Sequence, residues 1–500
     1  MQLSIRNLSF TYEGSYTPVF SNASVNLDTR WRLGLVGRNG RGKTTLLRLI
    51  LGQYPYQGAI DLPLSAAYFP YPVENPEQLT LFVLQSAAPD AEDWRFAREL
   101  KLLKVSEDAL YRPFETLSKG EQTKVLLCAL FAREDAYPLI DEPTNHLDMR
   151  GRALVADYLR QKDGFLLVSH DRAFLNGCID HVLSINKADI VIQQGDYDTW
   201  EEQFNRRNAY ERSRNEELKR DLRRLEESAR RTADWSAKVE KGKYHVPESE
   251  TASLDRGYVG ARSAAMMKRS LSVLRRRERA AEEKSKLLHN VETAGELKLN
   301  VLRHPKETLI SVQGGRVRYG ERTVCEGIAF EIRRGDRVAL TGANGAGKSS
   351  VLKTLCGLSG ALEGRVRVAS GLILSCVPQE TDGLTGGMRD FVRGYDLNET
   401  LFKAILRNMD FGREEFEKDL SELSQGQRKK ILLARSLCTP AHLYVWDEPL
   451  NYIDVISRVQ VERLICRCEP TLLLVEHDRA FLEKVCTREA IALKAPRAGG

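Results

Sequence analysis

Two glycine-rich stretches contain the residue types that bind phosphate. The segments GRNGRGKT (37–44) and GANGAGKS (342–349) both fit the pattern G-x-x-x-x-G-K-[ST]. In this pattern the glycines let backbone N–H groups close around phosphate oxygens at a helix N-terminus, where the dipole favours anions. Each stretch follows an apolar strand-like run and precedes a helix-like run, which is the context that the motif requires. A glycine-rich structural turn is the alternative, and two complete copies argue against it.

The lysine and hydroxyl of each copy predict a nucleotide site with magnesium. Lys43 and Lys348 should reach the β- and γ-phosphates, and Thr44 and Ser349 should supply hydroxyl ligands to Mg²⁺. The residues expected to bind ATP are Gly37, Asn39, Gly40, Gly42, Lys43, Thr44 and Thr45 in the first copy, and Gly342, Asn344, Gly345, Gly347, Lys348, Ser349 and Ser350 in the second.

Paired carboxylates and a histidine complete each predicted site. Asp141-Glu142 and Asp447-Glu448 each end an apolar strand-like run. The aspartate can hold the Mg²⁺ shell, and the glutamate can orient or deprotonate the attacking water. His170 and His477 close a later strand in each half. A single histidine at a strand end is usually structural, but its recurrence favours a catalytic role beside the γ-phosphate.

These motifs belong to an internal repeat. The segments 34–50, 117–131, 137–148 and 166–175 match 339–355, 423–437, 443–454 and 473–482, at offsets of 305 to 307 residues. A nearly constant offset indicates a duplicated domain. Apolar strand-like runs alternate with helical patterns in each copy, which predicts βα units on a parallel sheet. The predicted domains are 1–195, with a short arm insertion at about 72–116, and 307–500, with 196–306 between them.

Composition limits the class of protein. No basic N-terminal region followed by an apolar run is apparent, and no window resembles the roughly 20 apolar residues of a membrane span. Nine scattered cysteines fit a reducing cytoplasm better than a disulfide framework. We therefore expect a cytoplasmic protein that does not contact a membrane.

The segment between the two copies is basic and helical in pattern. Residues 201–300 hold 24 Lys and Arg against 18 Asp and Glu, an excess equal to the +6 of the whole chain. Such an excess suits a polyanion, although a charged helix is more often simply solvated. Apolar stripes lie at 218–229 and 267–288, separated by an irregular stretch that contains Pro247 and Gly257. The pattern predicts an antiparallel coiled-coil hairpin with a tip at about 239–262.

Taken together, the motifs resemble the ATP-binding cassette, with signature motifs LSKGEQ (117–122) and LSQGQ (423–427). The resemblance implies that the chain is an ATPase in which the signature of one cassette completes the ATP site of the other. Lys43 would pair with Ser424, and Lys348 with Ser118. The further ATP-binding residues that it implies are Ser118, Gly120 and Glu121, then Ser424, Gly426 and Gln427, and the adenine-stacking Tyr12 and Tyr319.

One position departs from the cassette pattern. Gln379 matches the glutamine that ligates Mg²⁺ in the second copy, but the first copy has Tyr71 at that place. A phenol cannot ligate Mg²⁺ as an amide does. We therefore expect both sites to bind ATP and the site on the first phosphate loop to hydrolyse it at a different rate.

Two cassettes joined by a charged helical segment, with DEPTNHLD (141–148) and paired HDRAFL motifs, resemble the ABC-F family of ribosome-associated ATPases. Within it, 31–49, 446–454 and 260–270 resemble the Lsa-type antibiotic-resistance proteins. This implies a monomer whose cassettes pair intramolecularly and whose hairpin enters the E site of the 70S ribosome, near 23S rRNA and the P-site tRNA. It further implies ribosome protection from lincosamides, pleuromutilins and streptogramin A at the peptidyl transferase centre.

Two alternatives stay open: a housekeeping ABC-F translation factor that relieves stalled ribosomes, and a transport or DNA-repair ATPase with separate partners. A basic hairpin gains salt-dependent affinity from RNA phosphates, and aromatic side chains stack on unpaired bases. The residues expected to contact rRNA or tRNA at the tip are Lys241, Lys243, Tyr244, His245, Arg256, Tyr258 and Arg262.

Overall fold

The computed structural model describes most of the repeated halves. The described residues are 1–14, 18–145, 147–186, 190–210, 213–214, 216–217, 220, 224, 227, 299–320, 322–343, 345–358 and 360–493. The chain divides into two compact units, one of residues 1–200 with 294–500 and the other of residues 201–293. The predicted coiled-coil stripes at 218–229 and 267–288 lie outside the described residues except for positions 220, 224 and 227, and the predicted hairpin tip lies wholly outside them.

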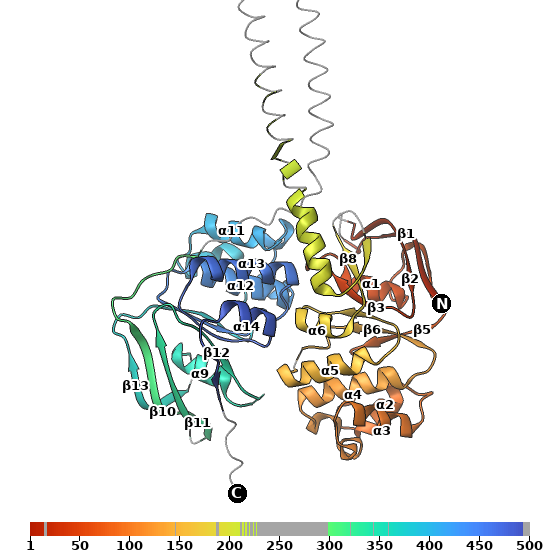
Figure 1. Cartoon of the computed structure of the whole chain (residues 1–500), viewed down its shortest axis with the longest axis horizontal. Helices are drawn as coiled ribbons and strands as arrows, with labels where there is room; N and C mark the ends of the chain where they lie inside the picture. The colour runs from red at the N-terminus through yellow and green to blue at the C-terminus, as the bar shows by residue number, and fades with distance from the viewer. Residues whose placement is uncertain are drawn as a thin grey trace, which may run out of the picture. The chain divides into compact units, whose positions relative to one another are not determined.

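The first cassette is built on a mainly parallel sheet of six strands in the order β5-β6-β7-β3-β8-β9 (Figure 1). Its strands are β3 (Arg32–Val36), β5 (Ser65–Phe69), β6 (Ala136–Asp141), β7 (Phe165–Val168), β8 (His181–Ile185) and β9 (Ile190–Gln194). Only β9 runs antiparallel to its neighbour. A separate antiparallel sheet has the order β2-β1-β4, with β1 at Gln2–Phe10, β2 at Phe20–Asp28 and β4 at Gln57–Asp61.

The second cassette repeats this plan. Its parallel sheet has the order β14-β15-β16-β12-β17, and its antiparallel sheet the order β11-β10-β13. The strands are β10 (Thr308–Tyr319), β11 (Arg322–Arg333), β12 (Arg337–Thr341), β13 (Ala361–Val368), β14 (Leu374–Val377), β15 (Leu443–Asp447), β16 (Leu472–Val475) and β17 (Ile491–Ala492). The predicted fold of two tandem nucleotide-binding domains with parallel sheets is confirmed.

Helices cover the sheets and carry the motifs. In the first cassette they are α1 (Lys43–Ile50), α2 (Thr80–Ala87), α3 (Asp93–Leu102), α4 (Lys119–Ala132), α5 (Met149–Arg160) and α6 (Arg172–Cys178), with short 3-10 turns at Glu107–Tyr111 and Phe114–Thr116. In the second they are α9 (Lys348–Leu355), α10 (Met388–Gly394), α11 (Glu399–Asn408), α12 (Gln425–Cys438), α13 (Val455–Cys468) and α14 (Arg479–Val485), with turns at Glu414–Phe416 and Leu420–Glu422. Residues 197–210 are also helical.

The central strands are apolar because both of their faces are covered. In the second cassette one face packs with α9 and the antiparallel sheet, and the other packs with α12 and α13. Every residue of β7 (FLLV) and β16 (LLLV) is buried, as parallel sheets in α/β proteins require. The carboxyl ends of β6 and β7, and of β15 and β16, therefore meet at one edge of each sheet. The paired carboxylates and the histidine follow directly there, so their proximity is a product of the strand order.

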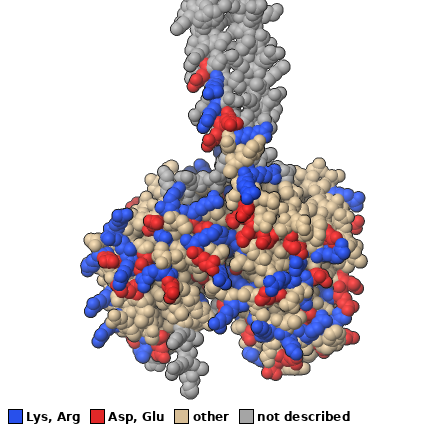
Figure 2. All heavy atoms as spheres, in the orientation of Figure 1, with Lys and Arg blue, Asp and Glu red and all other residues tan. Residues whose placement is uncertain are grey.

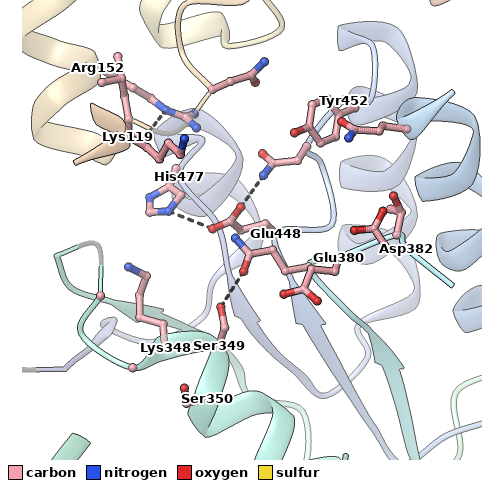
Figure 3. Close-up of a pocket in the computed structure, with 18 of the residues that line it drawn as sticks. Lys119, Arg152, Lys348, Ser349, Ser350, Glu380, Asp382, Glu448, Tyr452 and His477 are labelled. Carbon is pink, nitrogen blue, oxygen red and sulfur yellow. Dashed lines mark hydrogen bonds and ion pairs between the residues drawn. The ribbon is translucent and has the colours of Figure 1, made fainter. Parts of the chain in front are cut away.

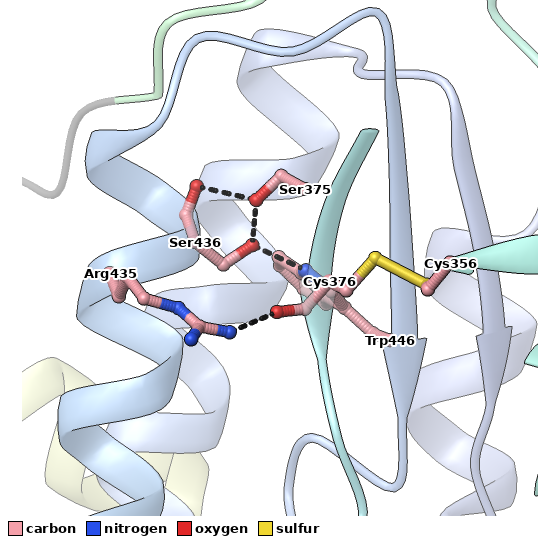
Figure 4. The surroundings of a disulfide bond; sticks show 6 residues. All are labelled: Cys356, Ser375, Cys376, Arg435, Ser436 and Trp446. Atoms are coloured by element: carbon pink, nitrogen blue, oxygen red, sulfur yellow. Dashed lines mark hydrogen bonds between the residues drawn. A yellow bond between two sulfur atoms is a disulfide. The ribbon is translucent and has the colours of Figure 1, made fainter. Parts of the chain in front are cut away.

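A buried polar network and a disulfide hold β14 in the second cassette (Figure 4). The Ser375 and Ser436 hydroxyls lie 2.7 Å apart, and the Trp446 indole donates to Ser436 Oγ at 2.9 Å. Cys376 is disulfide-bonded to Cys356, which follows α9. This single pair was not predicted from the sequence, and the other seven cysteines are free, so they form no disulfide framework. The spacing of the cysteines in the sequence did not indicate this pair, because 20 residues separate the two positions.

None of the described helices is long and apolar enough to cross a membrane. Lys, Arg, Asp and Glu side chains are interspersed over the face of the cassettes that Figure 2 presents.

Candidate active site

The phosphate loop of the first cassette closes on its own lysine. Lys43 Nζ donates to the carbonyl oxygens of Gly37 at 2.8 Å and Arg38 at 3.2 Å. It is also 3.4 Å from Asn39 Oδ1. Burial lowers the pKa of Lys43. The ammonium group therefore sits inside a ring of carbonyl oxygens, and an anionic phosphate would offer it a stronger partner than these neutral acceptors.

Gly42 is where the backbone demands glycine. It caps α1 with a left-handed φ of 85°, and Gly347 caps α9 in the same way with a φ of 86°. A Cβ on Gly42 would lie 2.5 Å from Val19 Cγ1 and 2.9 Å from the Phe20 ring. The loop can therefore turn into the helix only without a side chain here, which leaves the first N–H groups of α1 facing the cavity.

The predicted metal ligands of the first site lie together, with one hydroxyl that the sequence did not indicate. Thr44 Oγ1 donates to Asp141 Oδ2 at 2.8 Å. The Tyr68 hydroxyl donates to the same oxygen at 3.1 Å. Burial raises the pKa of Asp141. The hydroxyl and carboxylate set fits Mg²⁺, which prefers oxygen ligands and keeps several waters.

Tyr71, the departure from the cassette pattern, points elsewhere. Its hydroxyl contacts Ser86, at 3.2 Å from Ser86 Oγ. Tyr68 ends up beside the aspartate because it lies three residues earlier on β5, which pairs with β6 in parallel register. Of the two hydroxyl side chains on β5, Ser65 is exposed and Tyr68 is partly buried, but strand register was needed to place Tyr68 beside Asp141.

The predicted catalytic pair of the first site is in contact. His170 Nε2 lies 3.3 Å from Glu142 Oε1, and both side chains are largely buried. Glu142 adopts a left-handed φ of 51°, and Glu448 a φ of 46°. Such backbone conformations are costly for a residue with a side chain and cluster at functional sites. Burial, with Asp141 nearby, raises the pKa of Glu142 to about 8, which suits a general base working near neutral pH.

In the second phosphate loop the lysine is held in the same way as in the first, but the predicted metal ligands are arranged differently (Figure 3). Lys348 Nζ donates to the carbonyl oxygens of Gly342 at 2.9 Å and Ala343 at 3.0 Å. Ser349 Oγ donates to Gln379 Oε1 at 3.1 Å. Asp447 is 3% exposed, and within the described part of the chain neither carboxylate oxygen has a hydrogen bond of ordinary geometry, although the nearby Ser349 hydroxyl opposes the effect of burial on the pKa of Asp447.

A buried carboxylate without a hydrogen bond of ordinary geometry is rare and implies a missing ligand. Burial raises the pKa of Asp447 to about 6, which a nearby cation would reverse. The hydroxyl, amide and carboxylate oxygens of Ser349, Gln379 and Asp447 therefore fit Mg²⁺. The ion would neutralise charge on the terminal phosphates when bound.

Glu448 is set up differently from Glu142. Its Oε1 lies 3.5 Å from His477 Nε2, and the Asn451 amide donates to Oε2 (Figure 3). Although burial alone would raise the pKa of Glu448, the His477 ring and the Gln379 amide hold it below the ordinary value. The two catalytic carboxylates thus meet different surroundings, and Gln379 is one source of the difference.

Residues of both cassettes line the first cavity, whose volume is about 420 Å³. Ser424, Gly426 and Gln427 of the second signature face the first phosphate loop. Asn39 Nδ2 donates to the Tyr452 carbonyl across the seam at 2.8 Å. Thirteen of the predicted residues lie in this cavity: Tyr12, Asn39, Gly40, Gly42, Lys43, Thr44, Thr45, Asp141, Glu142, His170, Ser424, Gly426 and Gln427.

The second cavity, about 640 Å³, is also lined by both cassettes (Figure 3). From the second come Gly345, Gly347, Lys348, Ser349, Ser350, Gln379, Glu448 and His477. From the first come Lys119, Asn145, Leu147 and Arg152. The predicted partners Ser118, Gly120 and Glu121 do not line it, and their place is taken by the neighbouring Lys119. Asn344 lies outside the described residues, as do the seven predicted tip residues.

The two predicted adenine-stacking tyrosines are half-exposed. The Tyr12 hydroxyl lies 2.7 Å from Thr45 Oγ1, and its ring packs edge-on against Phe10 and Tyr54. Tyr319 is the last residue of β10. Its ring packs over Gly360, where an added Cβ would lie 3.3 Å from the ring. Tyr319 does not line the second cavity.

A further buried lysine supports the glutamine loop. Lys429, on α12, is fully buried and donates to the carbonyl oxygens of Pro378 at 2.8 Å and Gln379 at 3.2 Å. It also donates to the Asp447 carbonyl at 3.2 Å. The first cassette has Thr123 at this position of the signature helix. The burial of Lys429 was not predicted from the sequence, because a lysine on a helix normally lies in solvent.

Comparisons with known proteins agree with the geometry. A family model described as ABC transporter matches residues 20–145 and again 325–451. The chain is 30% identical to the ATP-binding protein Uup of Caulobacter vibrioides, covering 94% of this chain and 74% of Uup. It is 28% identical to the ribosome protection protein VmlR of Bacillus subtilis, covering 96% and 85%. It is 24% identical to the energy-dependent translational throttle protein EttA of Escherichia coli K12, covering 94% and 88%.

Among solved structures, the chain resembles the archaeal ribosome recycling factor aABCE1 in its complex with ribosomal stalk protein aP1. The TM-score is 0.59 at 21% identity, over 94% of this chain and 84% of that one. A structure of RNase-L inhibitor gives a TM-score of 0.59 at 20% identity, over 97% and 87%. At this identity the likeness concerns the fold. With two phosphate loops, two signatures and relatives that match it over about three quarters or more of their own length, the chain is an ATPase that belongs to the ABC-F family of tandem ATP-binding cassette proteins.

Proposed function

We propose that the chain is a ribosome-binding ATPase of the Lsa type. It enters the E site of the bacterial 70S ribosome and displaces lincosamide, pleuromutilin or streptogramin A antibiotics from the peptidyl transferase centre. The observation that carries the proposal is that both ATP cavities are lined from both cassettes of one chain. ATP binding therefore holds the cassettes closed, and hydrolysis releases them, which makes nucleotide a switch between two states.

The segment between the cassettes supplies the proposed partner surface. Its excess of positive charge over 201–300 suits the phosphates of 23S rRNA and the P-site tRNA. We assign residues 1–195 and 307–500 to the cassettes and 196–306 to the linker. The tip at about 239–262 is the proposed RNA contact. The similarity to VmlR, named as a ribosome protection protein, supports the choice of role.

At the ATP sites, we propose the roles that geometry supports. Glu142 and Glu448 orient or deprotonate the attacking water, and His170 and His477 hold those glutamates and the γ-phosphate. The metal ligands are Thr44 and Asp141 at the first site and Ser349, Gln379 and Asp447 at the second.

A second candidate function is a housekeeping translation factor, favoured by the similarity to EttA, named as a translational throttle protein. Expression of the chain in an antibiotic-sensitive host separates the two. The Lsa-type proposal expects raised tolerance to lincosamides or pleuromutilins, and unchanged susceptibility would favour the housekeeping role.

Binding to ribosomes is tested separately with the Glu142→Gln/Glu448→Gln variant. Because it retains ATP without hydrolysing it, it should co-sediment with ribosomes in ATP and not in ADP. Deleting residues 246–256 should abolish drug tolerance while ATPase activity remains. A variant that fails to co-sediment in ATP would refute both candidate functions, and retained tolerance after the deletion would refute the proposed role of the tip.

A further inference from the structure

An ion-pair cluster joins the first phosphate loop to the second cassette. Asp410 follows α11, and its carboxylate lies 3.3 Å from Arg41 Nη2 and 3.8 Å from Arg38 Nη1. The Arg38 side chain is only 6% exposed, whereas Asp410 is 32% exposed. Both arginines are variable positions of the phosphate-loop pattern, so nothing in the motif requires a charge there. The cluster therefore adds a contact that the nucleotide-binding motif itself does not need.

Asp410 is held in place by its own cassette. It sits in a tight turn with a left-handed φ of 61°. The carbonyl of the preceding Met409 accepts a hydrogen bond from Lys430 Nζ at 2.6 Å. Lys430 is buried on the signature helix α12 and pairs with Asp454 at 3.2 Å. Asp454 in turn caps α13. The carboxylate is thus fixed relative to both the signature helix and the helix that follows Glu448.

The same seam contains close backbone contacts. Asn39 Nδ2 donates to the Tyr452 carbonyl, and a Cβ on Gly426 would lie 3.3 Å from the same Asn39 nitrogen. Asp410 and Gly426 both line the cavity that contains Lys43. Any separation of the cassettes at this site would therefore break the Asp410 contacts together with those of the signature.

Among the described residues, the positions equivalent to this cluster in the other half of each cassette pair carry no such ion pairs, and a basic residue stands in place of Asp410. Lys104 occupies the same turn after α3 as Asp410 does after α11, with a φ of 51°. In both turns this residue's N–H bonds the carbonyl three residues back, and the next N–H bonds the carbonyl five residues back. In the second phosphate loop, Ala343 and Ala346 occupy the positions that Arg38 and Arg41 have in the first.

We propose that Asp410 is a positioning residue of the first ATP site. By pairing with Arg38 and Arg41 it aligns the second signature with the first phosphate loop, so that the first site closes more readily than the second. The charge pair also restrains the loop whose carbonyl oxygens hold Lys43. The inference concerns the ATPase cycle and is independent of the ribosomal role proposed above.

The test uses the full chain in a Glu448→Gln background, where turnover reports the first site. Arg38→Ala is added throughout, since alanine is the residue of the second loop and leaves one arginine to pair. In this background Asp410→Lys and Arg41→Asp should each raise the KM for ATP or lower kcat by about tenfold. Lysine suits the left-handed turn because Lys104 already occupies its counterpart.

The combined Arg41→Asp/Asp410→Lys variant should return to within about threefold of the background, because the pair is restored with its charges exchanged. A residue that acts only on local folding would give no such rescue. Lys104→Asp is the matched control and should stay within about twofold, since Ala343 and Ala346 offer no cation to pair. Singles indistinguishable from the background would overturn the proposal, as would a double variant no better than the worse single.

Discussion

At the scale of single residues, the two signatures cap their helices with different side chains. Ser118 is the N-cap of α4 and Ser424 is the N-cap of α12. Each forms a capping box with the residue three positions later. In the first signature the Ser118 hydroxyl donates to the Glu121 carboxylate at 2.8 Å. In the second, Gln427 accepts from the Ser424 backbone N–H at 2.8 Å and leaves the hydroxyl proton available. The capping is equivalent, but one box adds a negative charge where phosphate is expected.

Glu121→Gln should strengthen ATP binding at the second site. Ser118 and Glu121 do not line the second cavity in this structure. In the proposed closed state, where ATP draws the first signature onto the second phosphate loop, the change removes a carboxylate from the signature and frees the Ser118 hydroxyl proton for a phosphate oxygen. In a Glu142→Gln background, where the second site turns over, the KM for ATP should fall about threefold to tenfold.

The matched control is Gln427→Glu in the Glu448→Gln background, which should raise the KM of the first site by a similar factor. If both substitutions shift the KM in the same direction, the capping residue acts on helix stability and not on phosphate.

Motif residues such as Lys43, Glu142 and His170 could be predicted one by one, because the chemistry requires a given residue type at a given spacing. The left-handed backbone of Glu142 could not be predicted, since glutamate has no preference for that conformation. Tyr68 and Asp410 were also missed, because their roles depend on which strand or cassette lies opposite.

At the scale of elements, a buried carboxylate joins helices of the first cassette. Glu99 on α3 is fully buried and accepts from the Tyr158 hydroxyl at 2.6 Å. It also accepts from Lys162 Nζ at 2.5 Å and pairs with Arg98 at 2.9 Å. Although burial would raise its pKa, the Lys162 and Tyr158 hydrogen bonds hold the pKa of Glu99 below its ordinary 4.5.

Glu99→Gln should destabilise the chain by about 2–4 kcal/mol at pH 7, because Lys162 loses its buried partner. A carboxylate with a lowered pKa contributes stability above its ordinary value and loses it as pH falls through the lowered one. The difference between wild type and variant in denaturant unfolding should therefore be full at neutral pH and shrink below about pH 4.5.

Leu102→Ala serves as the control, since this side chain is 43% exposed on the same helix and should cost less than about 1 kcal/mol at every pH. A penalty for Glu99→Gln that stays constant down to pH 3 would contradict the ionic account. Neither α3 nor this contact was predicted from the sequence, because a glutamate on a short charged helix ordinarily lies in solvent.

At the scale of the whole molecule, the duplicated plan yields two unlike sites. The first site has Tyr68 on its aspartate and a glutamate of raised pKa. The second has Gln379, an aspartate without a hydrogen bond of ordinary geometry and a glutamate of lowered pKa.

Glu142→Gln and Glu448→Gln should therefore leave unequal residual ATPase rates, by about fivefold or more, measured on the full chain at saturating ATP. ATP binding at both sites should persist in each variant, which equilibrium binding would check. Equal residual rates would count against inequivalent sites.

The sequence was enough to predict the duplication and the parallel sheets. The resemblance to the family predicted that each signature faces the phosphate loop of the other cassette. The seam between the cassettes could not be predicted, because pairs such as Arg172–Glu462, 2.6 Å apart and nearly three hundred residues distant in sequence, leave no local pattern.

The reversed charge of the two equivalent turns also bears on how separate copies of the chain meet. If the first cassettes of two chains faced each other, Lys104 of each would lie opposite the Arg38 and Arg41 of the other. Like charges at close range disfavour that assembly. Two second cassettes would set Asp410 against Ala343 and Ala346, with no cation to pair. If Asp410 has the proposed positioning role, the turn after α11 would also favour pairing with the first cassette of the same chain.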